Sequence, residues 1–300
     1  MTGERSVSTE KAGIALVFGS ALAWSFGGTI ARFLTIEDAW TVVFWRALFA
    51  GLFLVAFLLV RDGPRATIRA FTSIRFPGLA VAFGFATAST SFVIAISYTT
   101  VANVILIQAS IPLLAALMSW VIFRERIALT TWAAIVAVIF GVGIMVSESL
   151  GGDASWIGNV LALVIAVVFA MVTVVTRRYT DVRMTPAAAV ACFVSMTVAA
   201  TQASSLTVTS GELGILFVFG ALNLGLGMAL FVTGARLIPS ALAALLGTAE
   251  SVLAPVWVGL VHGEVPGPLT FVGGSFVLAA LIVYLWLEFR KQSQVLPRHP

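Results

Sequence analysis

Ten long apolar runs follow one another along this 300-residue chain, separated by short connections. A run of about 20 apolar residues is long enough to cross a bilayer as a helix, and backbone inside lipid must satisfy its hydrogen bonds internally. A β-barrel would need short strands of alternating polarity instead. The sequence therefore predicts an all-α integral membrane protein with ten transmembrane helices. They are expected at residues 12–34, 39–60, 76–98, 100–123, 128–147, 155–176, 185–206, 212–235, 240–261 and 268–288.

The composition excludes a soluble domain, because 60% of the residues are hydrophobic and only 10% are charged, against about a quarter charged in soluble proteins. The first apolar run, 12–34, is too long for a cleaved signal peptide and is expected to remain as an anchor. The net charge of +4 comes from residues in short loops. This positive balance therefore indicates membrane topology and no nucleic-acid partner.

The basic residues predict the orientation. When the N-terminus is placed in the cytoplasm, fifteen of the seventeen basic residues fall on the cytoplasmic side of the ten segments, as the positive-inside rule requires. The exceptions are Arg32, at the outer end of the first segment, and Arg46, inside the second. Both termini are therefore expected in the cytoplasm. The opposite loops carry the acidic residues Glu37, Asp38, Glu148, Asp153 and Glu212.

The two halves of the chain resemble each other. Glu125 matches Glu264 in the turn between the last two segments of each half, and Gly13 matches Gly158 near the start of each half. Because five helices are an odd number, the second copy must enter the membrane upside down, which is typical of secondary transporters. Mere compositional similarity of apolar helices is the alternative. We expect repeat 1 at 12–148, repeat 2 at 152–290 and a cytoplasmic tail at 291–300.

The sequence lacks the motifs of a phosphate-binding loop, a metal site and a hydrolytic triad. The two lysines do not lie in a GxxxxGK[ST] phosphate-binding loop, and the two histidines, His262 and His299, cannot build a metal site. No serine has a histidine and an acid in a plausible hydrolytic arrangement. The single cysteine, Cys192, allows no disulfide or thiolate cluster. We therefore expect no enzyme activity, no metal and no cofactor.

Two charged residues lie inside apolar segments. Glu250 is about ten residues into the ninth segment, near mid-bilayer, where an acid indicates a functional site by default. It would hold the ammonium group of a substrate or bind a coupling proton, unless it only fixes helix packing. Arg46 would pair with Glu250 or face the substrate. The favoured interpretation of Arg46 is structural: snorkelling toward the headgroups, or binding carbonyls of a neighbouring helix.

Two prolines are expected to interrupt helices. Pro112 and Pro255 cannot donate to the carbonyl four residues earlier, which would free the carbonyls of Gln108 and Ser251. Such a turn suits a polar ligand, although a simple packing kink is an equal alternative. We expect the Gln108–Pro112 interruption to face the one between Glu250 and Pro255 across a central cavity.

The remaining polar groups at membrane depth are candidates for lining that cavity. They are the neutral residues Asn103, Gln108 and Asn223, together with Trp24. Residues of these types in membrane helices more often make interhelical contacts than ligand contacts. Gly225 and Gly227, which follow Asn223, allow close backbone approach or a bend.

Two tight connections occupy matched positions in the halves. Tyr98-Thr99-Thr100 is expected outside and Leu237-Ile238-Pro239 inside, each closing a short helical hairpin. Tyr98 and Pro239 are therefore gate candidates, one at each face. The alternative is that short loops only keep sequential helices adjacent.

Several motifs resemble the two EamA-type halves of the drug/metabolite transporter superfamily: AWSFGG, FWRALFAG, YTTVANV followed by IP and FRER, and AESVLAPVW followed by GE. The resemblance covers about 12–290 and implies inverted five-helix repeats, a central cavity and export of small metabolites without ATP hydrolysis. The sequence is most similar to the bacterial exporters of aromatic amino acids, which implies efflux of several amino acids. It departs from the family pattern at Ser251, where a proline usually follows the glutamate.

The first expectation for function is a monomeric, multi-pass exporter of amino acids in the bacterial inner membrane, working by alternating access. Its partners would be the lipid bilayer and a small-molecule substrate. The alternative transporter function is efflux of drugs or lipophilic cations, with Glu250 as the counter-charge. A passive channel is the alternative from another class.

Overall fold

The computed structural model describes residues 2–124, 129–150, 156–179, 184–235, 237–238, 246–247 and 249–295. Every regular element in these ranges is a helix, which confirms the all-α part of the predicted fold class. In the first half the elements are α1 (Thr2–Ser25), α2 (Gly27–Ala31), α3 (Ala39–Asp62), α4 (Pro64–Thr72), α5 (Phe76–Ala95), α6 (Val101–Gln108), α7 (Ile111–Phe123) and α8 (Leu129–Leu150). In the second half they are α9 (Trp156–Arg178), α10 (Met184–Gln202), α11 (Ser210–Phe217), the π-helix η1 (Val218–Gly225), α12 (Leu226–Gly234), α14 (Ala249–His262) and α15 (Pro268–Val295).

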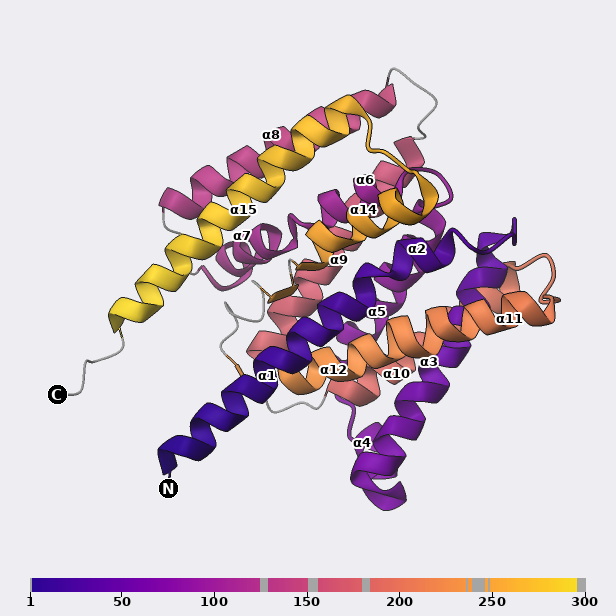
Figure 1. Cartoon of the computed structure of the whole chain (residues 1–300). Coiled ribbons are helices and arrows are strands. Elements are labelled where there is room, and N and C mark those ends of the chain that lie inside the picture. The colour runs from indigo at the N-terminus through magenta and orange to yellow at the C-terminus, as the bar shows by residue number, and fades with distance from the viewer. Residues whose placement is uncertain are drawn as a thin grey trace.

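Seven helices of the described chain are long and apolar enough to cross a membrane, and three shorter apolar helices lie at 132–145, 249–262 and 268–284. The shorter three fall on the remaining segments of the expected ten. The N-terminal end of α1 and the C-terminal end of α15 point the same way in Figure 1. The number of crossings and the side of the termini stay predictions.

The helices of one half pack mainly against helices of the other. α8 runs beside α15 (Figure 1), α3 packs on α10, α5 on α9, and α1 on α12. Counted as transmembrane segments, these pairs are 5 with 10, 2 with 7, 3 with 6 and 1 with 8. Exchanging each segment for its counterpart five places along reproduces the same set. The pairs therefore have the symmetry of a two-repeat fold.

Two matched glycines show this symmetry at the level of single residues. A Cβ at Gly158 would lie 2.7 Å from Thr99 Cγ2, and one at Gly13 would lie 2.5 Å from Ile238 Cγ2. Thr99 and Ile238 occupy matched positions in the two tight connections. Each glycine therefore allows the first helix of one repeat to approach the hairpin connection of the other, where a methyl group would not fit.

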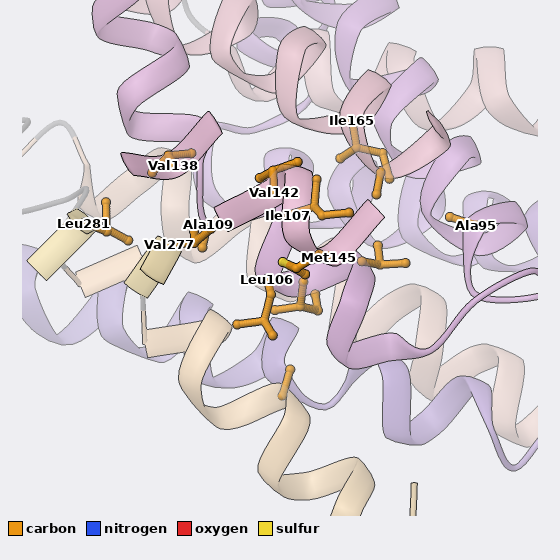
Figure 2. Packing of buried hydrophobic residues seen from close by; sticks show 14 of the residues in the cluster. Ala95, Leu106, Ile107, Ala109, Val138, Val142, Met145, Ile165, Val277 and Leu281 are labelled. Carbon is orange, nitrogen blue, oxygen red and sulfur yellow. The ribbon is translucent and has the colours of Figure 1, made fainter. Parts of the chain in front are cut away.

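A large apolar core lies where the last two segments of each repeat meet α9. Its members come from α5 to α9, α14 and α15, and Figure 2 shows Ile107, Met145, Ile165 and Val277 pointing into it. Ile107 and Met145 have no exposed surface. The outward faces of the bundle carry exposed phenylalanine, leucine and valine side chains, as lipid contact requires. This core holds α6 and α14 as neighbours, and both contribute to the candidate site.

Candidate functional site

The first membrane segment is broken in its middle. α1 ends at Ser25 and α2 begins at Gly27, with Phe26 between them. Asn223 of η1 donates from Nδ2 to the carbonyl of Ala23 at 2.6 Å and to that of Trp24 at 3.4 Å. These carbonyls lie in the last turn of α1, where acceptors lose their intrahelical donors. The Asn223 side chain therefore stabilises the break. Its amide nitrogen makes an interhelical contact and is not free to line a cavity.

The segment that carries Asn223 is itself irregular. Residues Val218–Gly225 form a π-helix within the eighth segment, and π-helical turns often occur at functional sites. Gly227 follows it and packs directly against the indole of Trp24, which leaves no space for a Cβ. Trp24 also contacts Phe231, with ring centroids 5.5 Å apart. The buried Trp24 Nε1 has no hydrogen-bond partner in the described structure.

Trp257 of α14 completes the wall at the break, although the sequence had not singled it out as a site residue. Its Nε1 donates to Ser25 Oγ at 3.1 Å, and its ring stacks on Phe26 with centroids 5.1 Å apart. Ser25 is fully buried. The only sequence signal for Trp257 was its place in the AESVLAPVW motif. The broken first segment is thus held by repeat 2 on two sides.

The fourth segment is also broken, whereas the ninth is not. α6 ends at Gln108 and α7 begins at Ile111, so Pro112 stands in the first turn of α7. The buried Gln108 Nε2 has no partner among the described residues. α14, in contrast, runs through Pro255 as one helix. The expected interruption at Pro255 is wrong, because a proline can remain inside a packed membrane helix when neighbours support it. α14 packs on α6, but no described hydrogen bond joins Gln108 to Glu250.

Arg46 lies in the interior of the bundle and is only 5% exposed. Its Nη1 donates to Ser89 Oγ at 3.1 Å and approaches the Ser89 carbonyl at 3.4 Å. The guanidinium carbon lies 4.3 Å from the ring centroid of Phe219 and 5.5 Å from that of Phe92. Snorkelling is therefore wrong for Arg46, since the side chain turns inward. Binding to a neighbouring helix accounts for Nη1, while the buried Nε has no partner among the described residues.

Glu250 stands in the first turn of α14 as described and is half-buried. Glu250 and Arg46 carry opposite charges. The ion pairs of the described chain, Arg32–Glu264 and Arg61–Asp62, include neither of them. Arg46 and Glu250 therefore form no ion pair with each other in the described structure.

Five residues of this region are expected at a similar membrane depth, and we call them the polar layer. Each lies seven to eleven residues from the outer end of its expected segment, or roughly 10–17 Å at 1.5 Å per residue. The polar layer consists of Trp24, Arg46, Gln108, Asn223 and Glu250. In the described part of the chain, no three His, Cys, Asp or Glu residues are grouped to hold a metal ion.

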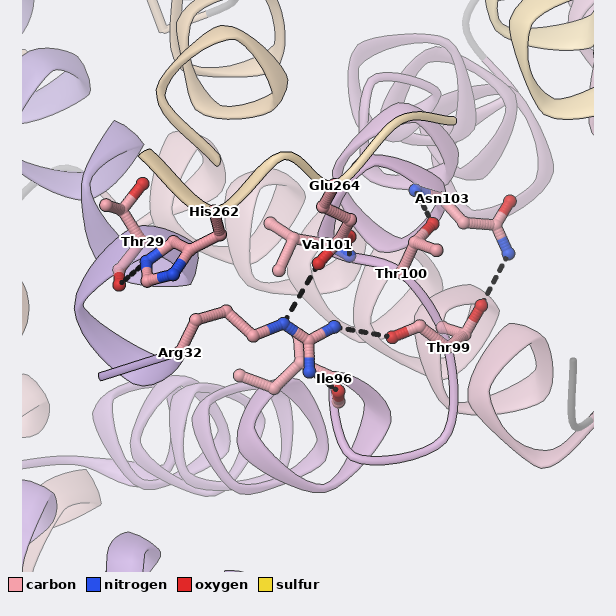
Figure 3. Close-up of polar contacts among 9 residues, drawn as sticks. All are labelled: Thr29, Arg32, Ile96, Thr99, Thr100, Val101, Asn103, His262 and Glu264. Carbon is pink, nitrogen blue, oxygen red and sulfur yellow. Dashed lines mark hydrogen bonds and ion pairs between the residues drawn. The ribbon is translucent and has the colours of Figure 1, made fainter. Parts of the chain in front are cut away.

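Above the polar layer, Arg32 and Glu264 join the two repeats at the predicted outer face. Arg32 Nε donates to Glu264 Oε2 at 3.0 Å, and its other nitrogens reach the carbonyls of Ile96 at 3.1 Å and Thr99 at 3.3 Å. Glu264 Oε1 accepts the Val101 N–H at 2.7 Å. Figure 3 shows the guanidinium between these segments. We call these five residues the outer clamp.

A second set of contacts extends the outer clamp to α9. Thr100 caps α6 by accepting the Asn103 N–H at 3.2 Å, and Asn103 Nδ2 donates to Thr99 Oγ1 at 3.1 Å. The same amide nitrogen donates to Asn159 of α9. Asn103 is 3% exposed, and its amide nitrogen is used within this set of contacts. Its role in the structure is to position the start of α6.

His262 ties the end of α14 to the first segment. Its Nε2 lies 3.0 Å from the carbonyl oxygen of Thr29 (Figure 3), and its ring meets Phe33 edge to face at 4.6 Å. Thr29 is 6% exposed, and its own hydroxyl has no partner among the described residues. The outer ends of segments 1, 3, 4, 6 and 9 are therefore linked by direct contacts in this structure.

The two gate candidates have different outcomes. Tyr98 lies in the tight connection between α5 and α6, but 46% of its surface is exposed and it is not a member of the outer clamp. Thr99, its neighbour, makes the contacts instead. Pro239 lies outside the described residues, as does the Glu125 elbow. Sequence reasoning missed the Arg32–Glu264 pair, although Arg32 stood out as a basic residue at the outer end of a segment.

Comparison with known proteins agrees with this architecture. The model of the family described as "EamA-like transporter family" matches the chain twice, over residues 11–147 and 156–286. No curated protein sequence matches the chain. A solved protein crystal structure superposes with a TM-score of 0.67 at 17% identity, covering 93% of this chain and 98% of that chain. At this identity the likeness shows the fold alone.

Proposed function

The chain belongs to the EamA-like transporter family, and we propose that it exports neutral amino acids, aromatic ones included, from the cytoplasm by alternating access between its two repeats. The observation that carries this proposal is the outer clamp above the polar layer. It closes the outer ends of the helices at the junction of the repeats. A substrate held in the polar layer would leave outward only after Arg32 and Glu264 separate.

The clamp has the properties of a reversible gate. Its ion pair is partly exposed to water, with 34% of the Arg32 side chain and 16% of the Glu264 side chain accessible. Exposed ion pairs contribute about 0.2–1 kcal/mol and charge-assisted hydrogen bonds about 1.5–3 kcal/mol each. A few such contacts are strong enough to favour a closed state and weak enough to open. No covalent link or metal ion is needed to hold it.

The polar layer supports small neutral or zwitterionic substrates. It contains one positive and one negative charge, two amides and an indole, beside the stacked rings of Phe26 and Trp257. An exporter also meets its substrate at high cytoplasmic concentration, so a site of modest affinity is adequate. Because the polar layer would make few fixed contacts to the side chain of the substrate, we expect it to accept many neutral amino acids.

We place the protein as a monomer in the inner membrane of a bacterium, with both termini in the cytoplasm. The distribution of fifteen of the seventeen basic residues to one side supports this orientation. We take repeat 1 as 12–148 and repeat 2 as 152–290, followed by the tail at 291–300. The packing of the two repeats on each other within one chain supports a monomer as the transport unit.

The test is transport by purified protein in proteoliposomes. Labelled amino acids and cationic dyes are offered as a panel, with and without a pH gradient, and empty liposomes provide the background. We expect saturable flux of several neutral amino acids and no dye flux above background. A pH-gradient dependence that Glu250→Gln abolishes would assign proton coupling to that carboxylate.

Three outcomes contradict the proposal. Amino-acid flux equal to that of empty liposomes removes the substrate class. Dye flux without amino-acid flux supports efflux of lipophilic cations instead. Unitary currents in a planar bilayer at rates far above carrier turnover indicate a channel.

A further inference from the structure

α4 is a short helix outside the expected transmembrane segments, and a tight turn fixes its place at the end of α3 (Figure 1). Gly63 ends α3 by donating its N–H to the Leu59 carbonyl at 3.0 Å, and α4 begins at the next residue. The φ of Gly63 is 77°, in the left-handed region that glycine adopts without strain. Pro64 follows in the first turn of α4, where proline is well tolerated. The turn therefore stops α3 at one residue and starts α4 in a new direction.

The helices on either side indicate the level of α4 in the membrane. α3 has 24 residues, or about 36 Å at 1.5 Å per residue, against a hydrocarbon thickness of about 30 Å. Val60 in the last turn of α3 is 89% exposed, and Phe76 at the start of α5 is 82% exposed. Such exposed apolar side chains at helix ends mark the edge of the hydrocarbon region. α4 lies between these two residues in the chain, which places it at the level of the lipid headgroups.

One face of α4 is fixed to the bundle. Thr67 and Ala70 are buried, and Phe71 packs against a core cluster to which α3, α5 and α10 contribute. Thr67 also donates its hydroxyl to the Gly63 carbonyl at 2.9 Å. α4 therefore packs on α3 and α10 in one rotational orientation, and its opposite face is presented outward.

The outward face carries two arginines and an isoleucine. Arg65 and Arg69 are four residues apart, so they are neighbours on the helix surface. Both are exposed, and their guanidinium groups make no ion pair or hydrogen bond in the described part of the chain. Ile68 is 63% exposed. Free cations together with an exposed apolar side chain are typical of a helix that lies in the interface of an anionic membrane.

Arg65 and Arg69 also border an open hollow of about 740 Å³, which continues to Ser73 one turn further on. Asp62 borders the hollow as well, but Arg61 already donates to both of its carboxylate oxygens, at 2.9 and 2.7 Å. The charge of Asp62 is thus compensated by its neighbour, and the two free arginines decide the sign of the hollow. A guanidinium matches the geometry of a phosphate group and can donate two hydrogen bonds to it.

We propose that the hollow on α4 binds the headgroup phosphate of an anionic phospholipid. Arg65 and Arg69 bind the phosphate, and Ile68 contacts the start of the acyl chains. The site is separate from the polar layer and the outer clamp, and it does not depend on which substrate the protein transports. Because α4 packs on α3 of repeat 1 and on α10 of repeat 2, a bound lipid stabilises the contact between the repeats at this end.

Lipid binding by the full-length protein in a neutral detergent tests the site. Delipidated protein is titrated with dioctanoyl phosphatidylglycerol, with dioctanoyl phosphatidylcholine and with inorganic phosphate, and Tm is recorded at low and high salt. Phosphatidylglycerol should raise Tm in a saturable manner. The rise should be smaller at high salt, because ions screen the arginines. No rise with phosphatidylglycerol, or an equal rise with phosphatidylcholine or with inorganic phosphate, overturns the lipid site.

Substitutions on the exposed face assign the contacts and leave the buried face intact. Arg65→Gln and Arg69→Gln should each weaken phosphatidylglycerol binding roughly fivefold, and together roughly thirtyfold. Ile68→Ser should weaken lipid binding several-fold and leave its salt dependence unchanged. The matched control combines Lys11→Gln with Arg124→Gln, which removes two exposed charges expected on the same face of the membrane. It should leave the affinity unchanged.

The outcomes separate a site on α4 from general attraction by net charge. If the control pair weakens binding as much as the α4 pair, only net charge matters and the site is overturned. Equal affinity of the wild-type protein and the folded variant with both Arg65→Gln and Arg69→Gln overturns it too. Neither result bears on amino-acid transport, which the flux assay in proteoliposomes measures separately.

Discussion

Arg32 and Glu264 lie 232 residues apart in the chain, yet their side chains meet at an Nε–Oε2 distance of 3.0 Å. The pair joins the end of the first segment to the turn between the last two segments of the second repeat. Because Glu264 also accepts the Val101 N–H, it links three segments at once. Loss of the Glu264 carboxylate should therefore open the outer face more than the loss of an ordinary surface ion pair.

The first prediction concerns access from outside. Glu264→Gln removes the charge and should weaken the clamp by about 1–2 kcal/mol, which raises the open population by roughly five- to thirtyfold. Thr29→Cys reports the change, because Thr29 is buried below the clamp and its hydroxyl has no partner in the described structure. Cys192→Ala first removes the only cysteine. Labelling by an impermeant maleimide in oriented vesicles should speed up accordingly.

Asp62→Asn is the control for this experiment. It breaks the ion pair with Arg61 at the C-terminal end of α3, which is not part of the outer clamp. It should leave the labelling rate of Thr29→Cys as it was. Equal rates with and without Glu264→Gln would show that the Arg32–Glu264 pair does not close the outer face.

The second prediction concerns the contact between Trp24 and Gly227. Gly227→Ala places a methyl group against the buried indole, and overpacking of this kind typically costs about 1–3 kcal/mol. We expect a Tm lower by several degrees in detergent. We also expect impaired amino-acid transport, because the new methyl group would displace the Trp24 indole within the polar layer. Gly214→Ala in α11 is the matched control, because no described atom outside its own helix turn lies within 4 Å of the position that the new methyl group would take. It should keep or raise Tm, since alanine favours helix over glycine.

The symmetric part of the fold was open to prediction from sequence. The matching of Gly13 with Gly158 relied on residue identity alone, and both glycines pack against matched connections of the opposite repeat. Inverted repeats keep such contacts because each helix meets the same neighbours twice. The helical class followed from apolar segment length, which lipid imposes on any membrane chain.

The irregular part of the fold was not open to prediction. Ser25-Phe26-Gly27 reads as part of one continuous apolar run, and the α1 end at this break is bonded by Asn223, 200 residues away from its acceptor Ala23. The π-helix around Asn223 likewise has no local sequence requirement beyond its glycines. Proline was an unreliable marker, since Pro112 stands at a break whereas Pro255 does not. Local patterns describe helices well, but breaks inside a bundle depend on tertiary partners.

The third prediction uses that difference between the prolines. Pro112→Ala adds an N–H that can bond to the Gln108 carbonyl and join α6 to α7, a gain of about 0.5–1.5 kcal/mol. We expect a Tm that is unchanged or higher, together with transport reduced several-fold, because the break between α6 and α7 beside Gln108 would close. Pro255→Ala in the continuous α14 should leave transport within about twofold. Equal effects of the two substitutions on transport rate would contradict a role for the break.

The fourth prediction concerns pH and Asp38, which lies outside the membrane-spanning segments. Its Oδ1 caps α3 by accepting the Trp40 N–H at 3.0 Å, and its Oδ2 accepts the Ser204 N–H and the Thr41 hydroxyl, both at 2.9 Å. Burial alone would raise the pKa of the Asp38 carboxyl. The hydrogen bonds, led by that from Ser204, outweigh burial and hold its pKa below the ordinary value.

A carboxyl group whose pKa is lower in the folded than in the unfolded chain stabilises the fold above the unfolded pKa, about 3.9 for aspartate. This contribution is lost as the pH falls toward the folded pKa. Asp38→Asn keeps a good helix cap but cannot ionise. Wild-type Tm should therefore exceed that of Asp38→Asn at pH 7, and the difference should shrink between pH 5 and pH 3 in thermal unfolding in detergent. A difference that stays constant over this range would mean that the Asp38 charge does not link α3 to the connection before α11.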